Sequence, residues 1–280
     1  MTVQRHVVDE LPALEAELNY MTPMGQRPRN YTDPPQGVPA SNISYDHHRV
    51  AIRDMRPIAS SLKLDDIGFA VVSEASAFPA DASEDEIKRL YYPQSEAILK
   101  HATGADRVHI FDHTLRRRVP GHPGGRDDGP RQPVLRVHID HTARSGPQRV
   151  RDLLRDEADE LLRGRVQVIN LWRPLRGPLH DSPLAVCDAR SVAAEDLVPT
   201  DLVYPHRVGE TYSVLYNPGH RWFYLSGMRT DEALLIKCCD SLDEGQARFT
   251  PHTSFVNETA PPGAPPRESV EIRALVFYSA

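Results

Sequence analysis

Two residues near the middle of the chain have types and spacing that suit metal binding. The segment Val134–Asp140, VLRVHID, is rich in β-branched residues and predicts a strand that ends in His138 and Asp140. Residues two apart on a strand point to the same side, so one imidazole and one carboxylate would face the same way. With one distant histidine they would form a two-histidine, one-carboxylate set, which leaves positions open on iron(II). The pair alone is weak evidence, because the chain has 13 histidines.

Residues in the C-terminal part extend this pattern. His252 lies in the segment PHTSFVN, and Arg267 follows fifteen residues later, where the last predicted strand begins. An arginine there can form a two-pronged ion pair with a carboxylate. Ser269 lies on the same face of the strand by alternation, so its hydroxyl can donate a further hydrogen bond. The order HxD, then a distant His, then RxS is much more specific than any one of its parts.

This order resembles the 2-oxoglutarate-dependent oxygenase superfamily, and longer segments resemble one subfamily of it. That subfamily is related to cephalosporin 7α-methoxylases and fungal gibberellin-desaturase-like proteins, which are oxygenases and desaturases of secondary metabolism. The resemblance covers roughly residues 45–280. The segments that carry it are FDHTLRRR, VHIDHT, INLWRPL, PLAVCDARSV, GETYSVLYNPGHRWFYLSGM, DEALLIKCCDS and PRESVEIRALVFY.

The resemblance implies an enzyme that uses Fe(II), 2-oxoglutarate as cosubstrate and O2. His138, Asp140 and His252 would be the iron ligands, and Arg267 would anchor 2-oxoglutarate. The expected reaction is hydroxylation or desaturation of a small natural-product intermediate, with succinate and CO2 as co-products. Halogenases of this superfamily have a small residue where this chain has Asp140, so halogenation is disfavoured.

Several alternatives stay open at the level of single residues. Arg273 is a second candidate for the 2-oxoglutarate anchor, because it lies on the same face of the same strand as Arg267. His220, in the segment NPGHRWFY, is a rival for the third metal ligand. Arg173 places a charge at the end of an apolar strand, where it would contact cosubstrate or substrate, or else pair with a buried carboxylate such as Asp188.

The elements that must position these residues are mostly short strands. They are rich in β-branched and aromatic residues and are separated by Gly, Pro and Asp turns. About eight strands with helices near the N-terminal half favour a mainly β fold with flanking helices and a double-stranded β-helix core, a cupin-like jelly roll. The predicted strands are Arg107–Phe111, Val134–Asp140, Val166–Trp172, Leu184–Asp188, Thr211–Tyr216, Trp222–Leu225, Ala233–Cys238 and Ser269–Tyr278.

Two helices are predicted from apolar spacing. The first covers about residues 83–103, where Ser83 and Glu86 form a capping box. Pro93 inside this helix should kink or split it. The second covers about residues 147–163 and ends before Gly164.

The remaining segments are predicted to be irregular. Residues 1–60 are rich in proline and polar residues, and residues 24–39 should be an extended arm or loop. Residues 119–133 read as a flexible loop in front of the HxD strand, either a lid or simply a disordered loop. We expect residues 1–280 to form a single oxygenase domain with this N-terminal arm.

The composition excludes several functional classes. Hydrophobic residues make up 40% of the chain and the net charge is −6, so a nucleic-acid groove is not expected. No apolar run reaches the roughly 18 residues of a membrane span, and the segment MTVQRHVVDELP shows no secretory signal. The three cysteines, two of them adjacent, do not form a disulfide framework, which suits a reducing cytoplasm.

Two other functional classes compete with the oxygenase. The first is a non-catalytic partner subunit of a related oxygenase complex, and a homodimer or a heterodimer with a related subunit is conceivable for this subfamily. The second is a zinc hydrolase or isomerase on a similar barrel. An intact ligand pattern followed by Arg267 disfavours both, because neither a scaffold nor a zinc site of that kind needs this arginine.

Overall fold

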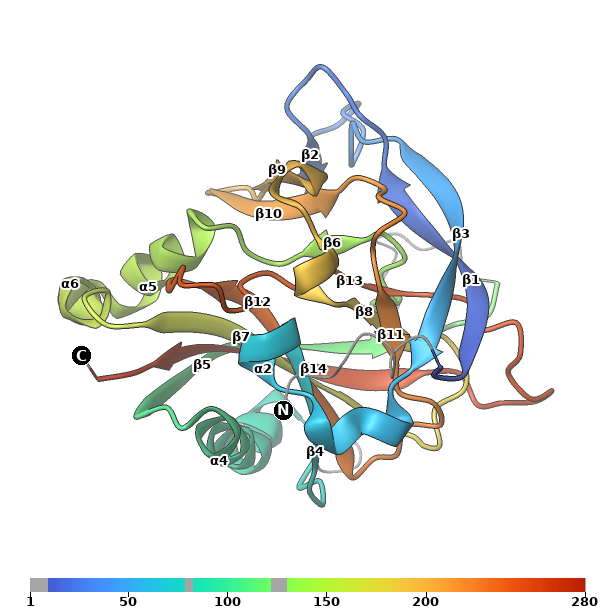
Figure 1. Ribbon diagram of the computed structural model, residues 1–280. Coiled ribbons are helices and arrows are strands. Elements are labelled where there is room, and N and C mark those ends of the chain that lie inside the picture. Colours follow the sequence, from blue (N-terminus) through green and yellow to red (C-terminus); the bar gives the residue numbers. More distant parts are fainter. Residues whose placement is uncertain (1–9, 79–82, 122–129, 280) are drawn as a thin grey trace.

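The chain folds into two facing β-sheets with helices against the outside of one of them (Figure 1). The computed structural model describes residues 10–78, 83–121 and 130–279. A nine-stranded sheet has the order β1-β3-β11-β8-β13-β6-β10-β9-β2, and a five-stranded sheet has the order β4-β12-β7-β14-β5. The predicted mainly β, jelly-roll architecture is therefore confirmed.

The strands divide between the two sheets as follows. The nine-stranded sheet contains β1 (Ala13–Met21), β2 (Arg29–Tyr31), β3 (Tyr45–Asp54), β6 (His138–Ile139), β8 (Leu184–Cys187), β9 (Leu197–Val203), β10 (Val208–Val214), β11 (Trp222–Tyr224) and β13 (His252–Ser254). The five-stranded sheet contains β4 (Phe69–Ser73), β5 (Arg107–Arg117), β7 (Val166–Pro174), β12 (Glu232–Asp240) and β14 (Glu268–Phe277).

The central strands of the five-stranded sheet are buried on both faces. All residues of β7 are buried, and they alternate between two cores. Val168 and Trp172 pack between the sheets, whereas Ile169 and Leu171 pack under the helix α4 (Tyr92–Thr103). This double burial explains why β7 reads as a continuous apolar run rather than as an alternating pattern.

The first predicted helix is present with the expected capping box. Ser83 Oγ accepts a hydrogen bond from the Glu86 backbone N–H at 3.3 Å, and the Glu86 carboxylate accepts one from the Ser83 N–H at 3.0 Å. The disturbance predicted at Pro93 takes the form of a π-helical turn over Ile87–Tyr91, between α3 (Glu84–Glu86) and α4. Proline lacks the N–H that a regular helical turn needs, and π-turns accommodate such breaks.

The second predicted helix is split and begins earlier than expected. It comprises α5 (Ser145–Leu154), a 3-10 turn over Arg155–Glu157 and α6 (Ala158–Leu161). The other helical elements are short: 3-10 turns over Arg56–Ser61, Ala189–Ser191 and Ala194–Asp196, and α2 (Leu64–Ile67). In the described ranges, no helix has the length and apolar character to cross a bilayer.

The prediction of an irregular arm over residues 1–60 is wrong for two long segments. The strands β1 and β3 pair antiparallel along their whole length, from Ala13 opposite Arg53 to Met21 opposite Tyr45. Alternate residues of β1 are buried, while charged residues between them face outward. Because the outward-facing residues of β1 are polar, its amino-acid composition does not indicate a strand.

Two other predicted segments differ from the structure. The strand predicted over residues 134–140 is reduced to β6, two residues that lie between β13 and β10. Residues 24–39 contain only the short strand β2. Of the loop predicted over residues 119–133, residues 122–129 lie outside the described part of the chain.

Candidate metal centre

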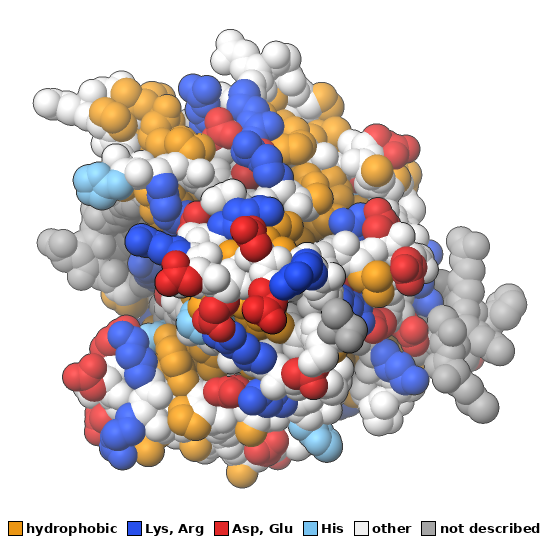
Figure 2. Space-filling model, turned by 90° about the vertical axis from the view of Figure 1, so that its left-hand side faces the viewer, with side chains coloured by type: hydrophobic (Ala, Val, Ile, Leu, Met, Phe, Trp, Pro, Cys, Tyr) orange, Lys and Arg blue, Asp and Glu red, His pale blue; other side chains and the backbone are white. Residues whose placement is uncertain are grey.

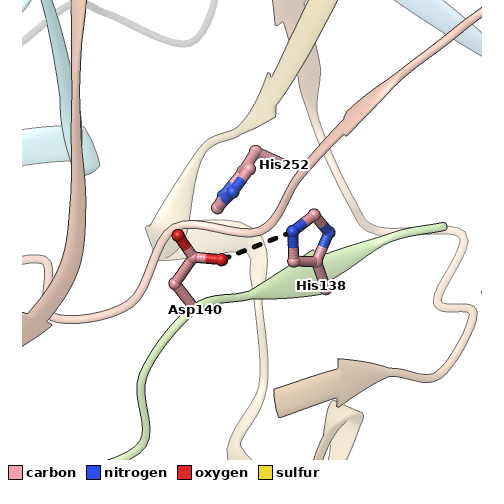
Figure 3. Close-up of side chains that lie close together, drawn as sticks. All are labelled: His138, Asp140 and His252. Carbon is pink, nitrogen blue, oxygen red and sulfur yellow. Dashed lines mark ion pairs between the residues drawn. The ribbon is translucent and has the colours of Figure 1, made fainter. Parts of the chain in front are cut away.

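Three predicted ligands come together on neighbouring strands of the nine-stranded sheet. His138 lies on β6, Asp140 directly follows that strand, and His252 on β13 is paired with His138 across the ladder. Their potential ligand atoms all lie within 4.8 Å of one another. Figure 3 shows the three side chains converging on one point, with 3.5 Å between His138 Nε2 and Asp140 Oδ1. Two imidazoles and one carboxylate on one side of a point can hold a divalent metal ion.

Backbone carbonyls orient both imidazoles. Nδ1 of His138 lies 2.9 Å from the carbonyl oxygen of Arg136, and Nδ1 of His252 lies 3.1 Å from that of Thr250. Each Nδ1 therefore carries the proton, and each Nε2 keeps its lone pair for a ligand bond. Burial, reinforced by the neighbouring His252, lowers the pKa of His138 to about 4. A neutral imidazole is the form that binds metal.

The carboxylate of Asp140 is held in place from one side. Its Oδ2 accepts hydrogen bonds from Asn170 Nδ2 at 2.8 Å and from Arg273 Nε at 3.1 Å. Burial alone would raise the pKa of Asp140, but the positive charge of Arg273, the hydrogen bond with His138 and the nearby imidazoles together outweigh it and hold the pKa well below its ordinary value. Asp140 is therefore ionised, and its other oxygen faces the two imidazoles.

Arg267 is a buried cation that has no carboxylate partner. It is 2% exposed, and in the described residues no acidic side chain lies within ion-pair distance of its guanidinium. Its Nε donates to Ser269 Oγ at 3.1 Å, one terminal nitrogen donates to the Ser182 carbonyl at 3.0 Å, and the guanidinium lies 4.9 Å from the Trp172 ring centroid. Burial lowers the pKa of Arg267 to about 9. Such a group can bind an external carboxylate without first breaking an ion pair.

Arg273, the second candidate anchor, has its donors already engaged. Besides Asp140, it donates to the Glu271 carboxylate at 2.8 Å and to Thr114 Oγ1 at 2.8 Å. Strand alternation brings both arginines to the inner side of the sheet, Arg267 directly before β14 and Arg273 within it. Of the two, Arg267 is the one without an acidic partner among the described residues. The arrangement makes Arg273 a positioning residue for Asp140.

An open cavity and a narrower recess meet at the metal-binding cluster. The cavity, of about 510 Å³, reaches His138 and Asp140, and the recess reaches His138, His252 and Arg267. Arg116 and His138 line both spaces. A molecule in the cavity and a carboxylate at Arg267 can therefore both approach the point on which the three ligands converge.

His220 is not brought to this cluster. Its Nε2 lies 3.1 Å from Asp196 Oδ2, and its Nδ1 lies 3.1 Å from the hydroxyl of Tyr20. Both ring nitrogens are thus engaged, and the ring stacks on that of Tyr20. Its role in the structure is to connect strands rather than to bind metal.

Both roles predicted for Arg173 are wrong. The alternation of β7 turns this side chain to the outer face, where it donates to the carbonyl oxygens of Glu74 at 2.8 Å and Thr230 at 3.1 Å. Asp188, its predicted partner, instead accepts hydrogen bonds from Arg190 and Arg221. Among the described residues, Arg173 therefore contacts neither the cavity lining nor a carboxylate.

The structure adds residues that sequence reasoning did not single out. Asn170 interrupts the apolar run of β7 and donates to both Asp140 and Glu271, each at 2.8 Å. Glu271 shares the inner face of β14 with Arg267 and Arg273. A polar residue inside a strand that is buried on both faces was the available signal for Asn170.

The chain is similar to proteins of known class over nearly its whole length. The family model described as "Oxidoreductase/YMDC permease-like domain" matches residues 18–277. The hydroxylase/desaturase efuI of Hormonema carpetanum is 33% identical, covering 86% of this chain and 87% of that protein. The Fe(II)/2-oxoglutarate-dependent dioxygenase nvfI of Aspergillus novofumigatus is 32% identical, covering 94% of this chain and 96% of that protein.

A solved structure agrees with these sequence relatives. The iron and alpha-ketoglutarate-dependent endoperoxidase NvfI superposes with a TM-score of 0.83 at 29% identity, covering 96% of this chain and 99% of that one. The ligand geometry, the full-length sequence similarity and the shared fold point in the same direction. The chain belongs to the family of Fe(II)/2-oxoglutarate-dependent dioxygenases.

Proposed function

We propose that this dioxygenase hydroxylates or desaturates a small natural-product intermediate, with Fe(II) held by His138, Asp140 and His252 and 2-oxoglutarate anchored by Arg267 and Ser269. The observation that supports this most is the proximity of the three ligand atoms to a buried cation. Three ligand atoms lie within 4.8 Å of one another, and His138 and His252 line the same recess as Arg267. Among the described residues, no carboxylate lies within ion-pair distance of this buried guanidinium.

Iron at this point would supply the activation of O2 for oxidation of a C–H bond, while 2-oxoglutarate is converted to succinate and CO2. The protein residues hold and orient the reactants. His138 and His252 offer their Nε2 atoms, and Asp140 offers an ionised oxygen, all from one side. The opposite side of the metal position is left for cosubstrate and O2.

Neighbouring residues determine how well this centre is organised. Arg273 and Asn170 keep Asp140 ionised and oriented, a task that such partners perform at metal sites generally. Arg267 would bind the far carboxylate of 2-oxoglutarate, and its hydrogen bond with Ser269 fixes the orientation of the guanidinium. The facing sheets bury this recess and so exclude water from it.

The subfamily, the role as a catalytic subunit and the cell compartment are also proposals. The seven segments quoted above favour a place near the cephalosporin 7α-methoxylases and gibberellin-desaturase-like proteins. The intact ligand set favours a catalytic subunit over a non-catalytic partner, whether the chain acts alone, as a homodimer or with a related subunit. The three buried free cysteines suit a reducing compartment such as the cytoplasm.

A matched pair of histidine variants tests the proposal. His252→Ala removes one of three protein ligands and should abolish succinate formation and reduce Fe(II) binding, while circular dichroism remains that of the folded chain. His220→Ala is the control, because both of its ring nitrogens are used in structural contacts. Full activity in His252→Ala together with loss in His220→Ala would show that the ligand assignment is wrong.

A further inference from the structure

The open cavity beside the metal centre is unusually rich in arginine. Seven arginines and four carboxylates are among the residues that line its volume of about 510 Å³. Figure 2 looks onto the side of the molecule where α5 lies, and basic and acidic side chains are interleaved across the middle of this face. The lining therefore carries more positive than negative charge, although the chain as a whole is acidic.

Some of this positive charge is neutralised within the protein. Arg273 is paired with Asp140 and Glu271. Arg144 donates to the carboxylate of Glu210 at 2.8 Å, and Arg27 pairs with the same carboxylate. Arg273 also pairs with Asp112 at 3.4 Å, so these contacts use three of the four acidic groups of the cavity wall.

Arg149 on α5 and Arg207 just before β10 differ from these pairs. In the described ranges of the chain, neither guanidinium has a carboxylate within ion-pair distance. Arg149 lies over the ring of Phe111 at 4.8 Å, and Arg207 lies over the ring of Tyr204 at 4.0 Å. Both arginines are therefore held on aromatic faces, with their N–H donors free of acidic partners.

The two guanidinium groups also act on each other. Burial lowers the pKa of Arg149, and the positive charge of Arg207 lowers it further. Asp152 and Asp112 lie near enough to Arg149 to offset part of this repulsion, but in the described ranges neither forms an ion pair with it. An anion bound between the two guanidinium groups would therefore reduce the repulsion that remains. Arginine forks suit carboxylate and phosphate oxygens particularly well, because they can donate two parallel hydrogen bonds.

We propose that Arg149 and Arg207 form a subsite for an anionic group of the substrate, a carboxylate or a phosphate. This inference rests on the proposed function, because it places the reacting carbon of the same molecule at the metal centre. Phe111, Leu202 and Val208 line the cavity between the charged groups and offer apolar surface for the body of the molecule. The substrate class is thus an organic acid or phosphate ester with a hydrophobic skeleton.

Binding of three probes to the metal-free full chain tests this subsite. The probes are 2-naphthoate, 2-naphthyl phosphate and methyl 2-naphthoate, which share an aromatic body and differ in charge. Nitrogen-15 NMR of the arginine Nε–Hε groups would report which arginines respond. We expect the signals of Arg149 and Arg207 to shift with the two anions, and the neutral ester to bind about tenfold more weakly or worse.

Variants complete the experiment. The double variant Arg149→Gln/Arg207→Gln should bind both anions at least about tenfold more weakly. Arg151→Gln is the matched control, since it removes the same charge from an exposed position of the same helix and should bind them as the wild type does. Circular dichroism establishes that each variant is folded. The stronger-binding anion identifies whether the subsite prefers carboxylate or phosphate.

Two results would overturn the inference: equal binding of the ester and the anions, or unchanged anion binding by the double variant. Because the probes are titrated without metal, the outcome is independent of catalysis. Anion binding at Arg149 and Arg207 by a chain that forms no succinate with Fe(II) and 2-oxoglutarate would contradict the proposed function and leave the subsite intact. Succinate formation without anion binding would contradict only the subsite.

Discussion

Two clusters of charged side chains lie in the core region of this chain, and they are built in opposite ways. The closed ion cluster consists of Asp65, Arg165, Lys237 and Asp240. Lys237 and Asp240 are fully buried, and Lys237 Nζ lies 2.8 Å from Asp240 Oδ2. Arg165 donates to both Asp240 and Asp65. Every charge in this cluster therefore meets an opposite charge inside the protein.

The metal-binding cluster lacks this closure. The Nε2 atoms of His138 and His252 converge with one Asp140 oxygen, and the nearby Arg267 has no acidic partner in the part of the chain that the structure describes. A buried polar network in which all groups are satisfied contributes to the folded state, whereas buried groups left without partners are costly unless a ligand completes them. Whether the buried charges are paired within the protein therefore distinguishes a structural cluster from a binding site better than their number or burial does.

The largest effect is expected from breaking the closed ion cluster. Lys237→Met keeps most of the side-chain volume but leaves Asp240 without one of its cations, so the free energy of unfolding should fall by about 3–5 kcal/mol. Urea denaturation followed by circular dichroism measures this. Lys88→Met, which removes an exposed helical pair with Glu84, is the control and should leave the free energy of unfolding nearly unchanged. Equal stability of the two variants would show that the cluster is not structural.

Arg267→Ala should act on the cosubstrate rather than on the fold. Loss of a charge-assisted, two-pronged contact corresponds to about 3 kcal/mol, so the apparent KM for 2-oxoglutarate should rise roughly a hundredfold. The affinity for Fe(II) should stay unchanged, because no ligand atom is removed. If Arg273→Ala produced the increase in KM and Arg267→Ala did not, the anchor would be assigned to the wrong arginine.

Arg273→Gln should weaken metal binding by about ten- to a hundredfold, as loss of a partner of a metal ligand typically does. Removing this positive charge raises the pKa of Asp140 from its depressed value. Metal binding requires the ionised carboxylate, so the variant should lose metal at a higher pH than the wild type as the pH falls. Metal titrations at several pH values measure the shift, and an unchanged acidic limb would contradict the positioning role.

The smallest effect concerns Asp65, at the exposed end of the closed ion cluster. Burial opposes ionisation of this group, but hydrogen bonds from Arg165 and Lys237 outweigh burial and lower its pKa to about 2. A depressed pKa stabilises the fold above the ordinary pKa of aspartate, and the contribution is lost as the pH falls from about 4 towards 2. The free energy of unfolding should decline over this range less steeply in Asp65→Asn than in the wild type.

Much of the fold could be predicted from the residue pattern. The buried strands β7, β12 and β14 and the capped helix at Ser83 were found, because apolar runs and capping residues are local signals. The sequence pattern does not reveal β1 and β3, since their outer faces are polar and a long, proline-rich connection rather than a tight turn joins them. The strand β13 has only three residues, so no periodicity could identify it.

The sequence predicts which residues form the candidate site, but not which arginine would bind the cosubstrate and which would position Asp140. The order HxD, His, RxS names residues that the structure brings close together. It could not distinguish Arg267 from Arg273, because both lie on the inner face of β14. Their difference arises from Asp140, which reaches Arg273 from a segment distant in the sequence, and from Glu271, which lies two residues before Arg273 on the same strand. Asn170 and the unpaired Arg149 likewise depend on such contacts.

The most direct test of the central claim is a crystal structure of the chain prepared anaerobically with Fe(II) and 2-oxoglutarate, with anomalous diffraction measured at the iron edge. The account predicts one iron peak between His138, Asp140 and His252, and a carboxylate of 2-oxoglutarate on the guanidinium of Arg267. An iron peak at the carboxylates of Asp65 and Asp240, or no bound iron under saturating conditions, would contradict it.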